Sequence, residues 1–417
     1  MTPHPHTVPG RICLVAEGQL GDLIILTPAI RALRASFPRA LIALLVLHRR
    51  RYATGSPPGP IVREDSRGGT AEVLRSDPGV DRIAEIDRDA LRALKGVARL
   101  RAELGVVRWM RGMRFDTVVC TFPQDRFFLW AFLSGARRRV GEGGRPLSFL
   151  LTSRTGAHRG KGGVLDYYCA LAGAAGAPVT DRATAVTIPP AHRRRADETW
   201  RSVRGRLRGR VVAVHPGASG DYRVWPPESY GKLIDRLQGE GISVLLAGSD
   251  FDRSVVLDVE RRCARAVPSI FTNDVLDLAA LLEKCALLVS NNSGPRHLAV
   301  ACGVPSLALI PRFDDIGWKI YDDEVRAGTL QSSAPCPACP ADSCRNAVPP
   351  GERYGSYCMR ALGAEDVAAR VLWLLGRLPG GRSRGATGVS PLPPRRPAYG
   401  SGRRSPAANR SKRRGSR

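Results

Sequence analysis

Short apolar runs alternate with amphipathic stretches along most of the chain. A buried strand is predicted over residues 11–16 (RICLVA), and a glycine-containing turn follows over residues 18–21. Apolar positions at helical spacing between Leu23 and Leu33 predict a helix, and a second strand follows over residues 41–47. A strand, a helix and a strand within so short a segment form a βαβ unit. This unit implies a parallel sheet with helices on its faces.

The pattern continues through the first half and starts again in the second. Each half carries glycine-bearing turns after its strands, where open parallel sheets bind their ligands. Two α/β halves therefore follow from the pattern, and a length of 417 residues also favours two cores over one. Further strands are predicted over residues 116–121, 211–215, 243–247, 287–290 and 306–310, and further helices over residues 126–134, 164–176, 228–240, 276–284 and 295–302.

Composition shifts divide the chain into five parts. A polar, Arg-rich stretch that contains a helix separates the two halves, and a final helix precedes a tail rich in Gly, Pro, Ser and Arg. Residues 49–70 are expected to form an exposed insertion. The predicted parts are an N-terminal domain (1–188), a junction (189–210), a C-terminal domain (211–362), a last helix (363–376) and a disordered tail (377–417).

The net charge of +26 raises the question of a nucleic-acid partner. Twelve of the Lys and Arg residues lie in the tail from Arg377 onward, which has no Asp or Glu, and the others are scattered. We therefore do not expect nucleic acid as a partner, although an RNA-binding arm remains an alternative for the tail. A peripheral contact of the tail with an anionic membrane is the other option. No signal peptide or long apolar run is evident, so a cytoplasmic protein is expected.

Several segments together resemble the enzymes of glycosyltransferase family 9, which include the lipopolysaccharide heptosyltransferases. These are GQLGDLIILTPAIRALRASFP in the first half, and HPGASGDYRVWPPESY, VLLAGSD and LAALLEKCALLVSNNSGPRHLAVACGVPSLALI in the second. The resemblance implies an α/β GT-B fold, in which two Rossmann-like domains face each other across a cleft. It also implies inverting, metal-independent transfer of a sugar, commonly heptose from ADP-heptose, with the acceptor on the first domain and the donor on the second.

Asp22 is the candidate catalytic base. Inverting transfer needs a group that takes the proton from the acceptor hydroxyl, and a carboxylate at the start of a helix is kept charged by the helix amides. The resemblance assigns this role to the Asp of the GDxIxxxPA pattern, with Gly18 and Gly21 on the acceptor side. A helix-capping role for Asp22 is the alternative.

The candidate donor site lies in the second half, where a leaving nucleoside diphosphate needs cations and N–H donors. The turn of Asn292, Ser293 and Gly294 precedes a helix, and His297 follows one turn later, with either a structural or a phosphate-binding role. The family pattern has Asp where this chain has Asn292, so the position keeps its hydrogen bonding but lacks the negative charge. Arg223, Ser219 and Asp250 are further candidates; Asp250 has a turn role as its alternative, and Trp225 is expected to pack in the core.

The ten cysteines fall into two groups. Six stand singly in apolar segments, as expected for core residues in a reducing compartment. Cys336, Cys339, Cys344 and Cys358 form a C-x2-C-x4-C-x13-C cluster in a Pro-rich loop. A structural zinc site, a reduced loop and a disulfide remain open for this cluster.

The leading hypothesis is a monomeric enzyme that transfers heptose or a related sugar to a lipopolysaccharide core or another cell-envelope glycan. One alternative is a nucleotide-sugar epimerase that shares the GT-B fold. Another is a non-catalytic binder of nucleotides or glycans, which the presence of Asn292 instead of Asp favours. The donor sugar, the acceptor and the linkage are not fixed by the sequence.

Overall fold

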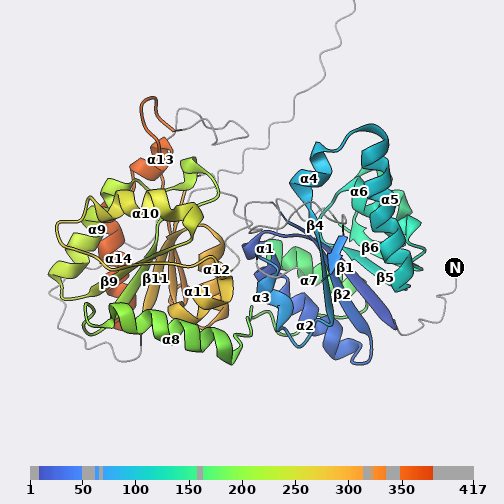
Figure 1. The fold of residues 1–417 in the computed structure, drawn as a ribbon, viewed down its shortest axis with the longest axis horizontal. Helices are drawn as coiled ribbons and strands as arrows, with labels where there is room; N and C mark the ends of the chain where they lie inside the picture. The colour runs from blue at the N-terminus through green and yellow to red at the C-terminus, as the bar shows by residue number, and fades with distance from the viewer. Residues whose placement is uncertain are drawn as a thin grey trace, which may run out of the picture. The chain divides into compact units, whose positions relative to one another are not determined.

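A computed structural model describes residues 9–48, 62–64, 69–156, 163–312, 321, 323–334 and 348–378. This part of the chain contains two sheets flanked by helices (Figure 1). We call residues 9–174 the N-terminal lobe and residues 211–377 the C-terminal lobe. The expected tail lies almost wholly outside the described residues, as does most of the 49–70 insertion. The described part of that range is not simply an exposed insertion, because Val62–Glu64 pairs with the sheet and Thr70 is buried. Within the described ranges, no helix is long and apolar enough to cross a bilayer.

The N-terminal lobe is built on a seven-stranded sheet in the order β3-β4-β2-β1-β5-β6-β7. Every neighbouring pair is parallel except β3 and β4. The inner strands are buried almost throughout, which explains why they read as continuous apolar runs in the sequence. The strands are β1 (Arg11–Glu17), β2 (Leu41–His48), β3 (Val62–Glu64), β4 (Arg82–Asp87), β5 (Thr117–Cys120), β6 (Arg138–Glu142) and β7 (Ser153–Thr155).

The single helix predicted after β1 is two helices, α1 (Leu20–Ile25) and α2 (Thr27–Ser36). Pro28 has no N–H, so it cannot bond to the carbonyl of Ile24 as the next turn of a continuous helix would require. The Thr27 hydroxyl donates to that carbonyl instead, at 2.7 Å. The apolar spacing predicted the buried face correctly, but the proline sets the break.

The remaining helices of the N-terminal lobe include one long helix that the apolar pattern did not predict. This helix, α5, has buried residues only in its second half, while the apolar residues Val97, Leu100 and Leu104 of its first half are exposed. Its apolar positions therefore do not form one stripe that faces the core, which is the pattern on which such predictions depend. The helices are α3 (Glu72–Arg75), α4 (Arg88–Ala93), α5 (Gly96–Met113), α6 (Asp125–Leu133), α7 (Val164–Ala174) and a short 3-10 helix, η2 (Pro146–Leu150).

The C-terminal lobe has a six-stranded sheet in the order β10-β9-β8-β11-β12-β13, and all neighbouring strands are parallel. Helix α8 (Pro190–Arg204) precedes this sheet, in the stretch predicted as the junction, and packs against α11 (Val275–Leu282). The strands are β8 (Val211–His215), β9 (Ser243–Gly248), β10 (Ser269–Phe271), β11 (Leu287–Asn291), β12 (Ser306–Ile310) and β13 (Ala327–Gln331).

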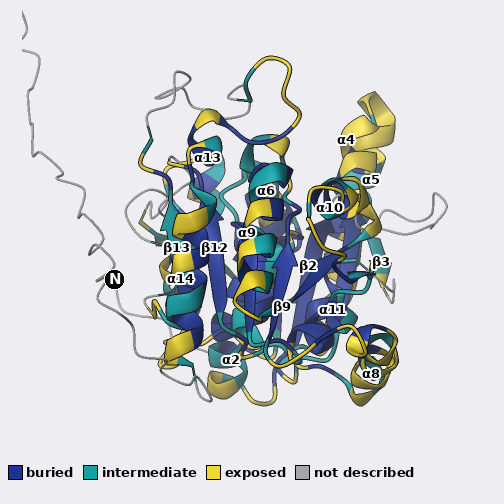
Figure 2. Ribbon diagram, turned by 90° about the vertical axis from the view of Figure 1, so that its left-hand side faces the viewer, coloured by how far each residue is buried: buried dark blue, intermediate teal, exposed yellow. Residues whose placement is uncertain are grey.

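Helices cover the second sheet as they cover the first, and its strands lie buried beneath them (Figure 2). The last helix packs against α9, so the end of the described chain belongs to the C-terminal core. The helices are η3 (Asp221–Arg223), α9 (Pro227–Gly239), η4 (Asp250–Asp252), α10 (Arg253–Glu260), α12 (Gly294–Ala301), α13 (Tyr357–Arg360) and α14 (Ala364–Arg377).

The described cysteines are free thiols. Cys13, Cys120 and Cys285 are buried, and burial raises the pKa of each thiol, which keeps it protonated. Of the Pro-rich cluster, only Cys358 lies within the described residues. It is buried, and its Sγ accepts a hydrogen bond from the amide of Arg312 at 3.4 Å. The proposed zinc site involves Cys336, Cys339 and Cys344, which lie outside the described residues.

Candidate active site

A cavity of about 860 Å³ lies between the two lobes, at the carboxyl ends of their strands. The N-terminal lobe contributes the beginning of α1 and part of α3, and the C-terminal lobe contributes the loops after β8, β9, β10 and β11. The predicted site residues that line it are Gly21, Asp22, Ser219, Arg223, Asp250, Asn292, Ser293, Gly294 and His297.

Gly18 is the one predicted site residue that does not line the cavity. A Cβ atom at Gly18 would lie 2.9 Å from the Cα of His48, so this glycine allows β1 and β2 to end side by side. Its amide donates to the carbonyl of Leu47 at 2.7 Å, and its carbonyl accepts from the Thr70 hydroxyl at 2.5 Å. Gly18 therefore shapes the turn that leads to Asp22.

The beginnings of α1 and α12 are in direct contact across the cleft. A Cβ atom at Gly21 would lie 2.8 Å from Cδ2 of His297, and one at Gly294 would lie 2.9 Å from Cβ of Leu20. Both glycines are therefore required for this close approach. The contact brings the predicted acceptor-side and donor-side motifs together, although they are far apart in the sequence.

Asp22 lies in the first turn of α1, and 8% of its surface is exposed. The N-cap of this helix is Gln19, so Asp22 does not occupy the capping position. The hydroxyl of Tyr168, on α7, donates a hydrogen bond to Oδ1 of Asp22 at 3.1 Å. Asp22 thus lines the cleft, and its carboxylate is held by a buried tyrosine that the sequence motifs did not include.

Asn291, at the end of β11, organises the loop that carries Ser219 and Arg223. Its buried side chain accepts hydrogen bonds from the amide of Trp225 at 3.0 Å and from the Tyr230 hydroxyl at 3.1 Å. It also donates to the carbonyl of Pro216 at 2.6 Å. Trp225 is fully buried, as expected from the sequence. The sequence signal that could have identified Asn291 is an amide side chain at the last position of a buried, mostly apolar strand.

The buried carboxylate of Asp252 packs directly against the loop that carries Ser219 and Arg223. A Cβ atom at Gly217 would lie only 1.9 Å from Oδ1 of Asp252, so the loop passes directly over this carboxylate. Asp252 accepts hydrogen bonds from the amide and hydroxyl of Ser249, and its Oδ2 lies 3.5 Å from Nε2 of His215. Burial alone would raise the pKa of Asp252, but His215 and the Ser249 hydrogen bonds outweigh it and lower the pKa to about 2.

Asp250, in contrast, is an exposed residue at the rim of the cleft. It pairs with Arg253 at 2.7 Å and accepts a hydrogen bond from the Asn273 amide at 2.6 Å. These two hydrogen bonds lower the pKa of Asp250. Its position is compatible with contact to a ligand hydroxyl and also with a role in the turn, so both interpretations of Asp250 persist.

The turn before α12 contains the Asn that replaces the family's Asp. Oδ1 of Asn292 accepts a hydrogen bond from Nη1 of Arg296 at 3.0 Å, and Arg296 is fully buried. The buried guanidinium adds positive charge beneath the turn. His297 is also buried, and its burial together with the charge of Arg296 lowers its pKa to about 3. The imidazole is therefore neutral near pH 7, and Nδ1 lies 3.2 Å from the Tyr321 hydroxyl.

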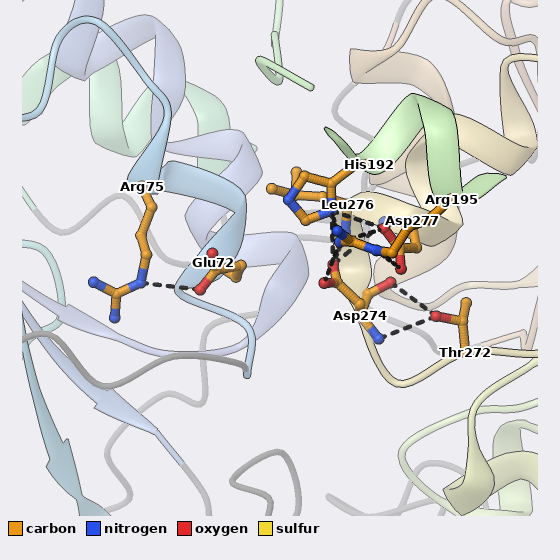
Figure 3. Close-up of polar contacts among 8 residues, drawn as sticks. All are labelled: Glu72, Arg75, His192, Arg195, Thr272, Asp274, Leu276 and Asp277. Atoms are coloured by element: carbon orange, nitrogen blue, oxygen red, sulfur yellow. Dashed lines mark hydrogen bonds and ion pairs between the residues drawn. The ribbon is translucent and has the colours of Figure 1, made fainter. Parts of the chain in front are cut away.

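A polar cluster on α8 and α11 adjoins the cleft. Nδ1 of His192 lies 2.8 Å from Oδ1 of Asp277, and Arg195 pairs with the same carboxylate at 2.8 Å (Figure 3). Asp274, which lines the cleft, caps α11 by accepting from the amide of Leu276 at 2.9 Å. His192 and the two aspartates have a spacing that suits a metal ion. Arg195 already supplies the cation there, so we assign the cluster a structural role in holding α8 on α11.

Comparisons with known proteins agree with this geometry. Residues 128–346 match the model of glycosyltransferase family 9 (heptosyltransferase). Lipopolysaccharide heptosyltransferase 3 of Escherichia coli is 22% identical over 317 residues, which cover 73% of this chain and 84% of that protein.

Two solved structures share the fold. A family 9 glycosyltransferase from Veillonella parvula DSM 2008 has a TM-score of 0.66 at 20% identity, over 88% of this chain and 97% of that one. An E. coli heptosyltransferase, solved with ADP-2-deoxy-2-fluoro heptose, has a TM-score of 0.57 at 16% identity, over 78% of this chain and 93% of that one. The predicted α/β GT-B fold is thereby confirmed.

Proposed function

Because the chain belongs to glycosyltransferase family 9, we propose that it transfers heptose from ADP-heptose to a lipopolysaccharide core or another cell-envelope glycan, with inversion at the anomeric carbon. The observation that carries this proposal is the cleft itself. Asp22 of one lobe lines the same cavity as the α12 turn and Arg223 of the other, which supports the proposal. The E. coli heptosyltransferase of similar fold was solved with ADP-2-deoxy-2-fluoro heptose, which supports the choice of ADP-heptose as the donor.

The C-terminal side of the cleft suits a diphosphate leaving group. The N-terminal end of α12 lines the cleft, and helix N-termini favour anions. Ser293 and Ser219 offer hydroxyl groups there, and Arg223 offers a guanidinium. These groups would stabilise the charge that develops on ADP as the sugar leaves. We therefore propose transfer without a catalytic metal.

On the opposite side, Asp22 acts as the base. The acceptor hydroxyl attacks the anomeric carbon and gives its proton to the carboxylate, while the bond from that carbon to the diphosphate oxygen breaks and ADP leaves. The Tyr168 hydrogen bond would hold the carboxylate in one orientation during this step. The acceptor then occupies the N-terminal lobe, as the resemblance implied. We further propose a monomer that acts in the cytoplasm at the inner membrane.

A donor screen followed by a transfer assay tests this proposal. The melting temperature is measured with ADP-, GDP-, UDP- and dTDP-sugars, because a ligand that binds the folded state raises it. ADP-heptose should give the largest increase. Release of ADP should then depend on an added heptose-deficient lipopolysaccharide acceptor. A larger shift with another nucleotide would contradict the donor, and donor binding without any transfer would favour a non-catalytic binder.

A further inference from the structure

Exposed apolar side chains gather on one part of the N-terminal lobe. Nine large hydrophobic residues are exposed among the described residues, and six of them belong to α5, α6 and η2. These elements contact one another, α5 with α6 and α6 with η2. Contiguous exposed apolar surface on a folded protein marks a contact with something else. The six are Val97, Leu100, Leu104, Leu129, Phe132 and Phe149.

Helix α5 presents a mixed apolar and basic face. Val97, Leu100 and Leu104 are 65%, 58% and 51% exposed, and their spacing of three and four residues places them on one side of the helix. Arg101 and Arg108 are exposed at positions on the same side. Residues 88–114, which span α4 and α5, contain eight Lys or Arg and two Asp or Glu, so their net charge is +6.

Within the described part of the chain, no neighbouring element buries residues 96–101 at the start of this helix. The buried residues of α5 are Val106, Val107 and Met110, all in its second half. Residues 96–101 are all exposed, and α4 and the start of α5 stand out as exposed in Figure 2. The acidic Glu103 is turned toward α6, where it accepts a hydrogen bond from Nε1 of Trp130 at 2.7 Å. Glu103 is the only acidic residue of α5, so the exposed face carries basic charge alone.

This face lies on segments joined to the acceptor side of the cleft. Helix α4 follows β4 directly, and Arg88 in its first turn forms a buried ion pair with Glu17 at 2.9 Å. Glu17 ends β1, only a few residues before Asp22. Helix α4, which precedes α5 in the chain, is thus joined by an ion pair to the strand that leads into the proposed catalytic base.

We propose that the face formed by Val97, Leu100, Arg101, Leu104 and Arg108 on α5 docks on an anionic phospholipid bilayer. The leucines and the valine enter the boundary of the acyl chains, and the arginines contact lipid phosphates. A nucleic acid would match the arginines but would leave the aliphatic side chains in water, so a bilayer fits both halves of the face. The benefit for a glycolipid acceptor rests on the proposed function, since docking would hold the acceptor side of the cleft at the membrane.

Vesicle sedimentation of the full-length protein tests the proposal without donor or acceptor, so its outcome does not depend on transferase activity. Phosphatidylglycerol vesicles are compared with phosphatidylcholine vesicles. Leu100→Gln/Leu104→Gln alters the apolar part without changing the charge, so the basic tail contributes equally to both proteins. Leu257→Gln is the matched control, because Leu257 is 37% exposed on α10 of the other lobe.

The wild type should prefer phosphatidylglycerol vesicles, and the double variant should bind them about tenfold more weakly. Arg101→Gln/Arg108→Gln should weaken binding at low salt by a similar factor. The control should bind as the wild type does. Equal binding by the leucine double variant and the wild type would overturn the proposal, as would absence of binding to anionic vesicles. Unchanged melting temperatures would exclude loss of folding as the cause of weaker binding.

Discussion

At the scale of single residues, the cleft depends on glycines whose missing side chains let other groups approach. Gly217 lets the loop after β8 pass over Asp252, and Gly21 lets α1 meet His297. At each position the neighbouring atom belongs to a residue that is itself buried and held. A methyl group at such a place must displace that residue or the loop.

Gly217→Ala should therefore weaken ADP binding more than tenfold and lower the free energy of unfolding by about 1–3 kcal/mol. The added Cβ would lie 1.9 Å from Oδ1 of Asp252. Calorimetric titration with ADP and chemical denaturation measure the two effects. Gly239→Ala is the matched control, since a Cβ there meets nothing within 4 Å. Wild-type affinity in Gly217→Ala would show that the loop is not tightly packed.

His297 should make the protein sensitive to acid. Its pKa is about 3 in the folded state, against 6.5 in the ordinary case. As the pH falls from 6.5 toward 3, the unfolded chain gains a proton here that the folded chain does not, so stability falls by about 1.4 kcal/mol per pH unit. His297→Gln should remove this part of the slope in denaturation curves taken across that range. An identical slope in both proteins would contradict the buried neutral imidazole.

At the scale of elements, Asn291 links β11 to the loop after β8 by hydrogen bonds to Pro216 and Trp225, on the two sides of that loop. Asn291→Ala would leave the amide of Trp225 and the carbonyl of Pro216 without this partner in a buried place. We expect a loss of about 2–3 kcal/mol in the free energy of unfolding and weaker ADP binding. Denaturant titration measures the change in the free energy of unfolding. Asn273→Ala, at an exposed position, should change stability little; equal losses in the two variants would argue against the role of Asn291.

The elements also show what the sequence could and could not predict. The inner strands β1, β2, β5, β8, β9, β11 and β12 were predictable because parallel strands buried on both faces are continuous apolar runs. The strands nearer the sheet edges, β3, β4, β6, β7, β10 and β13, were not predicted. The separation of α1 from α2 was encoded in Pro28, yet the apolar spacing runs through it. Helix α5 escaped prediction because half of it faces away from the core.

Contacts between distant segments were beyond local patterns. The Tyr168 to Asp22 hydrogen bond joins residues 146 positions apart, and the Asn291 to Trp225 bond joins residues 66 positions apart. Only the family resemblance brought Asp22 and the Asn292 turn into one hypothesis. The structure adds Tyr168, Asn291 and Asp252, whose roles depend on packing and not on motif spacing.

At the scale of the whole molecule, the two lobes meet where α1 and α12 begin, and Asp22 lines the same cavity as the loops after β8 and β11. Gly294→Val would add a branched side chain at a position where a Cβ atom alone would lie 2.9 Å from Cβ of Leu20. We expect it to lower kcat more than tenfold, because displacement of α1 moves Asp22 relative to the donor. Steady-state kinetics measures the effect, and a kcat within twofold of wild type would contradict the importance of this contact.

Asp22→Asn separates proton transfer from donor binding, with Asp235→Asn on α9, outside the cleft, as the matched control. The decisive measurement is kcat for heptose transfer together with the Kd for ADP. We predict that kcat falls about a hundredfold or more while the Kd for ADP and the melting temperature stay near wild type, since only proton transfer is lost. Turnover by Asp22→Asn within a few fold of wild type would contradict the assignment of Asp22 as the base.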